Sequence, residues 1–430
     1  MTDDRIEPTP EMSRALMRGM TQRRLSRRQL IKVGGVSVGA LSLSSILAAC
    51  GKTEAGSGTG TTGSTVDFSA TPGTEINFAN WPLYIDKSTN ADGDRYSPSL
   101  DGFTKANDIT VNYETVINSN DSFFGKLLPQ LEAGQDTGWD IIVITNGREL
   151  TALIQNEWVT ELDPSMRPNF DANAAPFAKD PVYDPGNKFS MAWQSGTTGI
   201  GYDTTKVSGP ITTMDDLMNP DLVGTASVGM LKQDMPDLVM INLGITPADS
   251  GPEQWKEAAA WIQKLKDSGT VRTFYDQGYI DDLVAGNLSA TMAWSGDVLY
   301  YKIWEGYPFE FIVPDGGALL WIDNMLIPVG AKNPQGAYKL MDYYYDPEVA
   351  QDVTEWVAYM SPVPAVQELI ADHAKEEKDP DTAAALAAMA ESPFLWPDDA
   401  MLSQLKFGRE FTTDDEREEW DSIFIPLTES

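Results

Sequence analysis

Hydrophobic positions in residues 76–158 follow two alternating periods. Short apolar, β-branched runs predict strands, and apolar residues three or four positions apart predict helices. The predicted strands cover 76–81, 109–116 and 139–145, and the predicted helices cover a segment with Leu100 and Phe103, then 122–134 and 148–158. This β-α-β-α-β-α order predicts an open, largely parallel sheet covered on both faces. In such sheets ligands bind beyond the carboxyl ends of strands, where Trp81 and Thr145 lie.

A second run of the same kind begins near residue 198. Its predicted strands cover 224–230, 271–276, 289–294 and 309–314, its predicted helices cover 237–244, 252–269 and 279–286, and the chain after 321–330 is largely helical in period. A chain of 430 residues is long enough for two or three domains. The pattern therefore predicts an α/β fold of two lobes, each a sheet flanked by helices, with the ligand in the cleft between them.

The first 49 residues differ from the rest in composition. They carry eight basic and four acidic residues and end in a small-residue apolar stretch that is too short for a comfortable transmembrane helix. The segment around Arg27 and Arg28 resembles a twin-arginine export signal, and Leu47 to Cys50 resembles a lipoprotein box. We expect a signal peptide over 1–49 and lipid on Cys50; an uncleaved membrane anchor is the alternative.

Cys50 is the only cysteine in the chain. Its lipidation would leave no thiol for a disulfide, a metal site or a nucleophile. Residues 50–74 are rich in Gly, Thr and Ser, a composition typical of a flexible tether between the anchor and the folded body.

The net charge of the chain is −33. Such a surface repels nucleic acid and attracts cationic solutes, so we expect no nucleic-acid partner. The charge also fits a protein that only needs solubility or lives in a salty habitat.

Two short stretches place an aromatic ring close to a carboxylate. Trp294 and Asp297 are separated by Ser-Gly, and Trp321 and Asp323 lie two apart on a predicted extended segment, so their side chains point the same way. A π face and a carboxylate suit an organic cation. The alternative is a core tryptophan followed by a helix N-cap aspartate.

Other chemistry finds few suitable residues. The only histidine, His373, lies in a charged helical segment that we expect at the surface, so a Ser/His/Asp group is not expected. With one histidine and one cysteine, no zinc-type metal site is expected. The pattern predicts no enzyme and no cofactor.

Several motifs occur in the order seen in one family. They are Asn80-Trp81-Pro82-Leu83-Tyr84, Trp139-Asp140-Ile141-Ile142-Val143, Trp294-Ser295-Gly296-Asp297, Trp321-Ile322-Asp323, the helix start at Pro347-Glu348-Val349-Ala350, and Tyr359. Over residues 75–365 the chain resembles the polyamine-binding (spermidine/putrescine-type) solute-binding proteins of ATP-driven importers, which have a type II periplasmic-binding-protein fold.

The resemblance implies a set of ligand-binding residues. Aromatic side chains would surround the methylene chain of the ligand, and carboxylates would receive its ammonium groups. The aromatic residues are Trp81, Tyr84, Trp294, Trp321 and Tyr359, and the acidic residues are Asp297, Asp323 and Asp234, the last of which stands where the family usually has a glutamate.

Some positions depart from the family pattern. Leu231 stands where the spermidine branch tends to have another carboxylate, and Gly147 stands where an aromatic residue or a serine is expected. A shorter diamine, or an amine whose own carboxylate is read by Arg148, therefore stays open. Two further alternatives are a solute-binding protein for a sugar and a surface hydrolase that uses carboxylates.

The resemblance also implies partners and a place in the cell. We expect a monomer that binds a cationic amine and delivers it to the membrane permease of an importer. It would be held by lipid on the outer face of the cytoplasmic membrane, in the periplasm if an outer membrane exists. The expected lobes are 75–197 with 321–365, and 198–320 with 366–430.

Overall fold

The computed structural model describes residues 66–90, 93–411 and 413–429. They belong to one compact unit that begins at Val66. The predicted export signal, with Arg27 and Arg28, and the predicted lipidation site at Cys50 lie outside the described residues.

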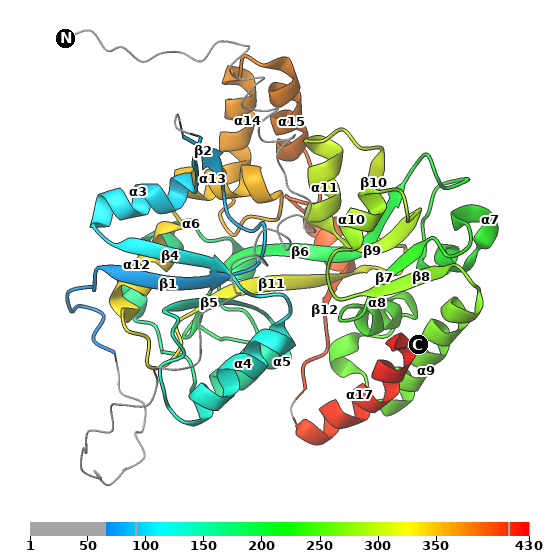
Figure 1. Ribbon diagram of the computed structural model, residues 1–430, viewed down its shortest axis with the longest axis horizontal. Helices are drawn as coiled ribbons and strands as arrows, with labels where there is room; N and C mark the ends of the chain where they lie inside the picture. Colours follow the sequence, from blue (N-terminus) through cyan, green and yellow to red (C-terminus); the bar gives the residue numbers. More distant parts are fainter. Residues whose placement is uncertain (1–65, 91–92, 412, 430) are drawn as a thin grey trace, which may run out of the picture. The chain divides into compact units, whose positions relative to one another are not determined.

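One mixed sheet runs through the unit, with helices on both sides (Figure 1). Its strands are ordered β4-β1-β5-β11-β6-β9-β7-β8, and β10 and β12 pair with β6 and β11. The strands are β1 (Glu75–Asn80), β4 (Thr110–Thr115), β5 (Ile141–Thr145), β6 (Ser190–Asp203), β7 (Val228–Leu231), β8 (Val271–Tyr275), β9 (Ala290–Trp294), β10 (Phe309–Ile312), β11 (Ala318–Leu326) and β12 (Leu405–Phe407), and β2 (Ser88–Thr89) pairs with β3 (Arg95–Tyr96) separately.

The prediction of a largely parallel sheet holds only at the two ends of this sheet. There β1 runs parallel to β4 and β5, and β7 runs parallel to β8 and β9. In the middle, β11 is antiparallel to β5 and β6, and β6 is antiparallel to β9. The α/β fold class is confirmed, but a continuous sheet replaces the two separate sheets expected from the pattern.

Strand β6 is the longest strand that the sequence pattern missed. All 14 of its residues are buried, and it pairs with β11, β9 and β10. In Figure 1, β6 and β11 run across the centre and connect the half that contains β1 to the half that contains β8. Residues on these two strands therefore lie where the two halves meet.

Helices cover the faces of the sheet. They are α3 (Pro98–Asn107), α4 (Asn120–Glu132), α5 (Arg148–Gln155), α6 (Pro168–Asn173), α7 (Pro220–Val223), α8 (Met235–Asn242), α9 (Pro252–Asp267), α10 (Tyr279–Val284), α11 (Ser295–Ile303), α12 (Pro334–Tyr343), α13 (Pro347–Val357), α14 (Val366–Glu376), α15 (Pro380–Ala390), α16 (Asp399–Gln404) and α17 (Asp414–Thr428). Short 3₁₀ turns occur at Pro164–Met166, Pro176–Ala178, Met214–Met218 and Pro247–Asp249. None of the helices in the described part of the chain is long and apolar enough to cross a membrane.

Several helices start at an Asp-Pro or Asn-Pro pair. Asn333, Asp346 and Asp379 each cap a helix, accepting a backbone N–H bond from the first turn, and a proline follows each of them. This works because proline has no N–H to lose at the first helical position and its φ is already helical. The helix starts are therefore encoded locally.

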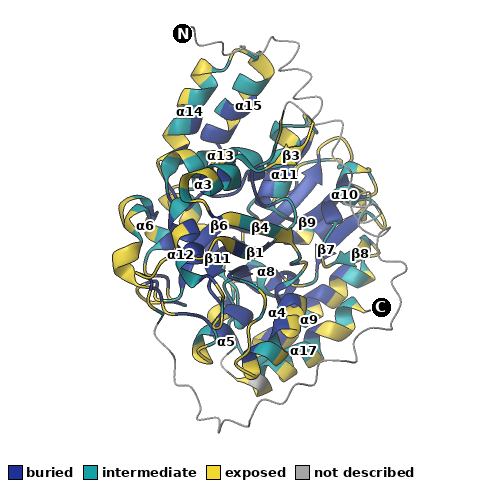
Figure 2. Cartoon of the chain, turned by 60° about the vertical axis from the view of Figure 1, so that its left-hand side comes forward, coloured by how far each residue is buried: buried dark blue, intermediate teal, exposed yellow. Residues whose placement is uncertain are grey.

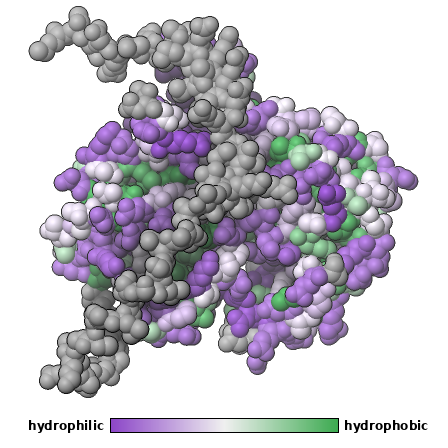
Figure 3. All heavy atoms as spheres, in the orientation of Figure 1, coloured by the Kyte–Doolittle hydropathy of each residue, from purple (hydrophilic) through white to green (hydrophobic). Residues whose placement is uncertain are grey.

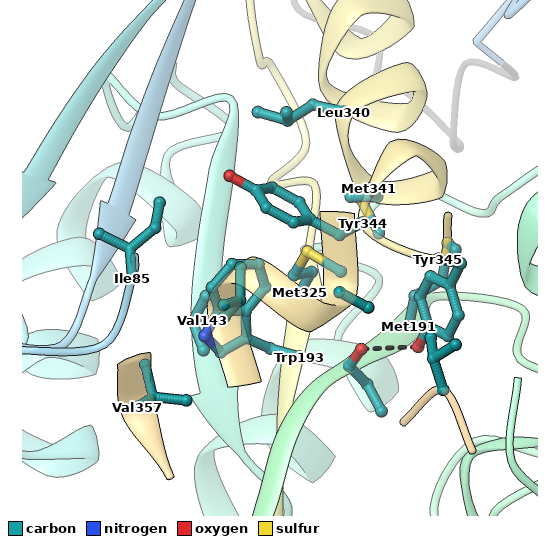
Figure 4. Packing of buried hydrophobic residues seen from close by; sticks show 14 of the residues in the cluster. Ile85, Val143, Met191, Trp193, Met325, Leu340, Met341, Tyr344, Tyr345 and Val357 are labelled. Atoms are coloured by element: carbon teal, nitrogen blue, oxygen red, sulfur yellow. Dashed lines mark hydrogen bonds between the residues drawn. The ribbon is translucent and has the colours of Figure 1, made fainter. Parts of the chain in front are cut away.

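Two main hydrophobic cores lie on either side of the central strands. The first core contains Phe78 and Trp193, and the second core contains Trp255 and Phe309. Figure 4 shows the packing of the first core, in which Trp193 lies among aliphatic and tyrosine side chains and the Tyr345 hydroxyl donates to the Ala192 carbonyl at 2.6 Å. Figure 2 shows the buried residues concentrated on the central strands.

Residues that precede β1 also contact the folded unit. Phe68 is buried in the first core, with its ring 4.8 Å from that of Tyr338 on α12. The backbone N–H of Gly73 donates to Asn333 Oδ1 at 2.9 Å. Phe68 and Gly73 therefore contact the fold on the N-terminal side of residue 75, and the predicted boundary at residue 75 stays a prediction.

The C-terminal helices pack on different cores. Val366 and Ile370 of α14 and Leu386 and Met389 of α15 are buried in the first core. Phe424 of α17 is buried in the second core.

Hydrophilic residues predominate over the described part of the surface seen in Figure 3.

Candidate binding site at the central strands

One face of β6, β11 and β9 carries three of the eight predicted site residues. Strand pairing places Asp323 opposite Gln194, Trp321 opposite Gly196, and Trp294 opposite Thr198. Directly opposed residues share a face, and positions two apart along a strand share it too. Gln194, Gly196 and Thr198 of β6 therefore form a surface with Trp321, Asp323 and Trp294, which we call the site floor.

Asp323 is held by two hydroxyl groups. Tyr84 Oη donates to Asp323 Oδ2 at 2.7 Å, and Thr145 Oγ1 donates to Asp323 Oδ1 at 2.6 Å. The aspartate is 6% exposed, and burial raises the pKa of its carboxyl to about 6. The two hydrogen bonds and the nearby Asp234 are the smaller influences on that pKa.

Asp234 lies at the start of α8, with 8% of its surface exposed. Its Oδ2 accepts bonds from Thr198 Oγ1 at 2.7 Å and from Trp294 Nε1 at 2.8 Å. Burial raises its pKa, and these two bonds oppose the rise. Trp294 therefore positions a carboxylate through its N–H while its ring stays half-buried.

Asp297 lies in the first turn of α11, whose N-cap is Trp294, so it is not itself the cap. Tyr279 Oη donates to Asp297 Oδ2 at 2.9 Å, and Tyr359 Oη donates to Asp297 Oδ1 at 3.1 Å. Tyr279 also accepts a bond from the Trp294 backbone N–H at 2.8 Å. The stretch from Trp294 to Asp297 is thus fixed at both ends.

Tyr359 joins the parts of the site. Its ring centroid lies 5.6 Å from that of Tyr84 and 5.3 Å from that of Trp321. The approach depends on two glycines, because a Cβ on Gly296 would lie 2.6 Å from the Tyr359 ring and a Cβ on Gly196 would lie 2.5 Å from the Trp321 ring. Ring contacts and hydrogen bonds thus connect Tyr84, Asp234, Trp294, Asp297, Trp321, Asp323 and Tyr359.

Trp81 is the predicted site residue that these contacts do not include. It is half-buried, and its Nε1 donates to the Val143 carbonyl of β5 at 3.2 Å. Its ring packs against the first core and against a third hydrophobic cluster, which contains Phe123 of α4 and Leu150 of α5. Contact of Trp81 with a ligand stays a prediction.

Neither Asp234 nor Asp323 is paired with a basic side chain among the described residues. Their hydrogen-bond donors are neutral hydroxyl and indole groups. Buried carboxylates without a positive partner disfavour their own ionisation. This arrangement can accept a cation from outside the chain.

A profile of the bacterial extracellular solute-binding protein family matches residues 99–388. That is more than half of the chain. The chain belongs to this family. Its activity is accordingly to bind a solute rather than to catalyse a reaction.

Curated relatives are similar at moderate identity. A spermidine/putrescine-binding periplasmic protein of Salmonella typhimurium is 25% identical over 302 residues, which cover 70% of this chain and 81% of the relative. A putrescine-binding periplasmic protein of Escherichia coli is 29% identical over 323 residues, with the same coverage of 70% and 81%.

Solved structures of similar fold include proteins of Streptococcus pneumoniae and Listeria monocytogenes. A spermidine/putrescine transporter substrate-binding protein of Streptococcus pneumoniae superposes with a TM-score of 0.66 at 23% identity, over 83% of this chain and 98% of that protein. A Listeria monocytogenes protein described as a spermidine/putrescine transporter superposes with a TM-score of 0.67 at 23% identity, over 83% and 99%. These similarities support the two-lobed periplasmic-binding-protein fold.

The departures from the polyamine pattern have local explanations. Arg148 makes ion pairs with Asp121 at 2.6 Å and with Glu149 at 2.7 Å, so its charge is already matched. Gly147, the residue before α5, has a φ of +133°, which favours glycine. Leu231 ends β7 and is 1% exposed.

Sequence reasoning missed three residues that hold the site carboxylates. Thr198 and Tyr279 were not predicted at all, and Thr145 was expected only as a residue at a strand end. Local pattern gave no signal for Thr198 or Tyr279, because their roles arise from strand and helix packing between distant segments.

The only histidine of the chain, His373, lies on α14. His373 has 42% of its side chain exposed, as predicted for a surface residue, and its Nδ1 lies 2.8 Å from Glu355 Oε1. Among the residues that the structure describes, no group of three or more His, Cys, Asp or Glu side chains could hold a metal ion.

Proposed function

We propose that this protein captures a polyamine outside the cytoplasmic membrane and delivers it to the permease of an ATP-driven importer. The names of the curated relatives support a ligand with two or more ammonium groups separated by short methylene chains. The family membership supports capture of a solute as the activity.

One observation carries the choice of a cation. Asp323 and Asp234 are both more than nine-tenths buried, both have raised pKa values caused by burial, and both accept bonds from neutral groups. An ammonium group would supply the missing positive charge and form charge-assisted hydrogen bonds. A neutral sugar would leave these buried carboxylates without a charge partner.

The aromatic residues suit the rest of such a ligand. Trp321 and Tyr359 are in ring contact, and Trp294 lies on the same floor beside Asp234. Their faces can pack against methylene groups, and a cation over an indole face contributes on the order of 0.5–2 kcal/mol. We propose that Trp81 and Tyr84 complete this enclosure.

Capture would bring two lobes together. We propose the predicted division, in which residues 75–197 and 321–365 form the first lobe and residues 198–320 and 366–430 form the second. Helices α14 and α15, which follow residue 365, pack on the first core. Asp323 and Tyr359 belong to the first of these lobes and Asp234 belongs to the second, so a ligand that reaches both carboxylates would contact both lobes. Its contacts with both would favour the closed arrangement.

The place in the cell follows from motifs at the N-terminus. We propose export through the twin-arginine signal at Arg27 and Arg28 and lipidation of Cys50, which would hold a monomer on the outer face of the membrane. Loss of the membrane-bound fraction in a Cys50→Ala variant, measured by fractionation of cells, would be the expected result.

Isothermal titration calorimetry tests the ligand. The purified protein, freed of bound amine by unfolding and refolding, is titrated with putrescine, cadaverine, spermidine and spermine, with butylamine and glucose as controls. We expect saturable binding of at least one polyamine at one site and none of the controls. A folded protein that is silent with all four polyamines would contradict the proposal.

A further inference from the structure

Seven buried side-chain atoms have no hydrogen-bond partner among the described residues, and three of them lie on the central strands. The three are Gln194 Oε1, Thr197 Oγ1 and Trp321 Nε1. Thr197 alternates to the opposite face of β6 from the site floor. Gln194 differs from Thr197, because the Gln194 side chain lies on the site floor together with the carboxylate of Asp323.

The register places Gln194 directly opposite Asp323. Gln194 is 3% exposed, and two residues along the same face Gly196 is covered by the Trp321 and Tyr359 rings. The amide therefore lies beside Asp323 and within the aromatic part of the floor. A buried amide oxygen without a partner is costly, so a native protein retains one mainly where another molecule satisfies it.

Asp323 has a limited capacity to bind an ammonium group. Each of its two oxygens already accepts one hydroxyl bond, from Thr145 and from Tyr84. A carboxylate has about four lone-pair sites, so about two remain. A primary ammonium group carries three N–H bonds and needs a third acceptor, whereas a secondary ammonium group carries two and does not.

We propose that Gln194 and Asp323 together form a subsite for a primary ammonium group, in which the Gln194 amide oxygen is the third acceptor. Gln194 then determines specificity for a terminal amine at this end of the ligand. The inference rests on the proposed function, since it requires that a polyamine occupies the floor. The inference predicts that methylation of the terminal amines weakens binding, because the methylated ammonium group loses its hydrogen bond to the Gln194 amide oxygen.

The test compares two ligands and three variants of the full chain. The ligands are whichever of putrescine and spermidine binds more tightly, and the same molecule with one methyl group on each terminal amine. Gln194→Met keeps the length of the side chain and removes the amide, and Gln194→Glu keeps an acceptor. Gln155→Met, at an exposed position at the end of α5, is the control.

For wild type and the control we expect the methylated ligand to bind more weakly. Gln194→Met should bind the unmethylated ligand about tenfold or more weakly, because a hydrogen bond to a charged group is lost. It should also lose most of the discrimination between the two ligands, and Gln194→Glu should retain it. Melting curves show that each variant is folded.

Two results would overturn the inference while leaving the proposed function intact. One is wild-type affinity for the unmethylated ligand in both Gln194 variants. The other is an unchanged methylation penalty in Gln194→Met, which would assign the penalty to steric bulk alone. Failure of the folded wild type to bind either amine would instead remove the proposed function, and the inference with it.

Discussion

Two buried aspartates, Asp184 before β6 and Asp323 on β11, have very different surroundings. Asp184 is 2% exposed and accepts bonds from the backbone N–H groups of Lys188, Phe189 and Ser190 and from the Ser190 hydroxyl, at 2.7–3.1 Å. All four donors come from a single nearby stretch of chain. Asp323, 6% exposed, accepts two bonds, both from hydroxyl groups on distant segments.

The difference separates a structural carboxylate from one that is available to a ligand. Backbone N–H groups around Asp184 occupy its oxygens and fix the loop that leads into β6. Asp323 keeps unused lone pairs, and burial raises its pKa to about 6. A buried carboxylate with spare hydrogen-bonding capacity is thus a better indicator of a cation site than burial or charge alone.

The largest expected effect is on affinity when the charge of Asp323 is removed. Asp323→Asn keeps the shape of the side chain and leaves the bound ammonium group without its counter-charge. We expect the affinity for the polyamine to fall on the order of a thousandfold, as when one partner of a buried charged pair is lost. Calorimetry measures this, and near wild-type affinity in a folded variant would remove Asp323 from the site.

The same substitution at Asp184 should affect folding instead. In Asp184→Asn the new amide would present an NH₂ group to backbone donors, so at least one bond would be replaced by a repulsive contact. We expect this variant to have a free energy of unfolding lower by about 2–3 kcal/mol. Urea unfolding measures it, and the affinity of the folded fraction should stay unchanged. Weaker binding with normal stability would reverse the assignment of the two aspartates.

The affinity should also depend on pH through Asp323. Its pKa in the ligand-free protein is raised to about 6, so below this pH a proton must leave before an ammonium group can bind. We expect the affinity to rise about tenfold between pH 5 and pH 7.5 and to be level above that range. Asp234, whose pKa is also raised by burial, acts in the same direction. A flat profile would show that Asp323 does not ionise on binding.

A further effect concerns the stability of the ligand-free protein. Because the folded pKa of Asp323 is raised from 3.8 to about 6, the folded state holds the proton more tightly and loses stability as the pH rises through this window. Asp323→Asn removes this loss. We expect the variant to be about 3 kcal/mol more stable than wild type at pH 7.5, because the shift spans about two pKa units, and close to it near pH 4. Destabilisation at pH 7.5 would mean that Asp323, like Asp184, is structural.

Much of the fold could be predicted from the sequence because most elements are locally encoded. Strand β5 is a continuous apolar run, α9 has a clear helical period, and proline marks the starts of α12 and α13. Strand β6 was missed because its Gly, Ser and Thr residues give no alternation when both faces are buried. Its antiparallel pairing with β11 depends on segments more than a hundred residues apart.

The grouping of the candidate site residues could be predicted to the extent that they belong to contiguous motifs. Trp294 with Asp297 and Trp321 with Asp323 are adjacent in sequence, and the resemblance added Tyr84, Tyr359 and Asp234. Gln194 and Thr198 could not be predicted, since their positions follow from the register of β6 against β11 and β9.

The central claim is that Asp323 receives an ammonium group on the site floor. A crystal structure of the protein with its tightest polyamine tests this most directly. The account predicts a terminal nitrogen about 3 Å from the Asp323 carboxylate, within reach of the Gln194 amide, and methylene groups against Trp321 and Tyr359. A polyamine bound elsewhere, with Asp323 still contacting only Tyr84 and Thr145, would contradict it.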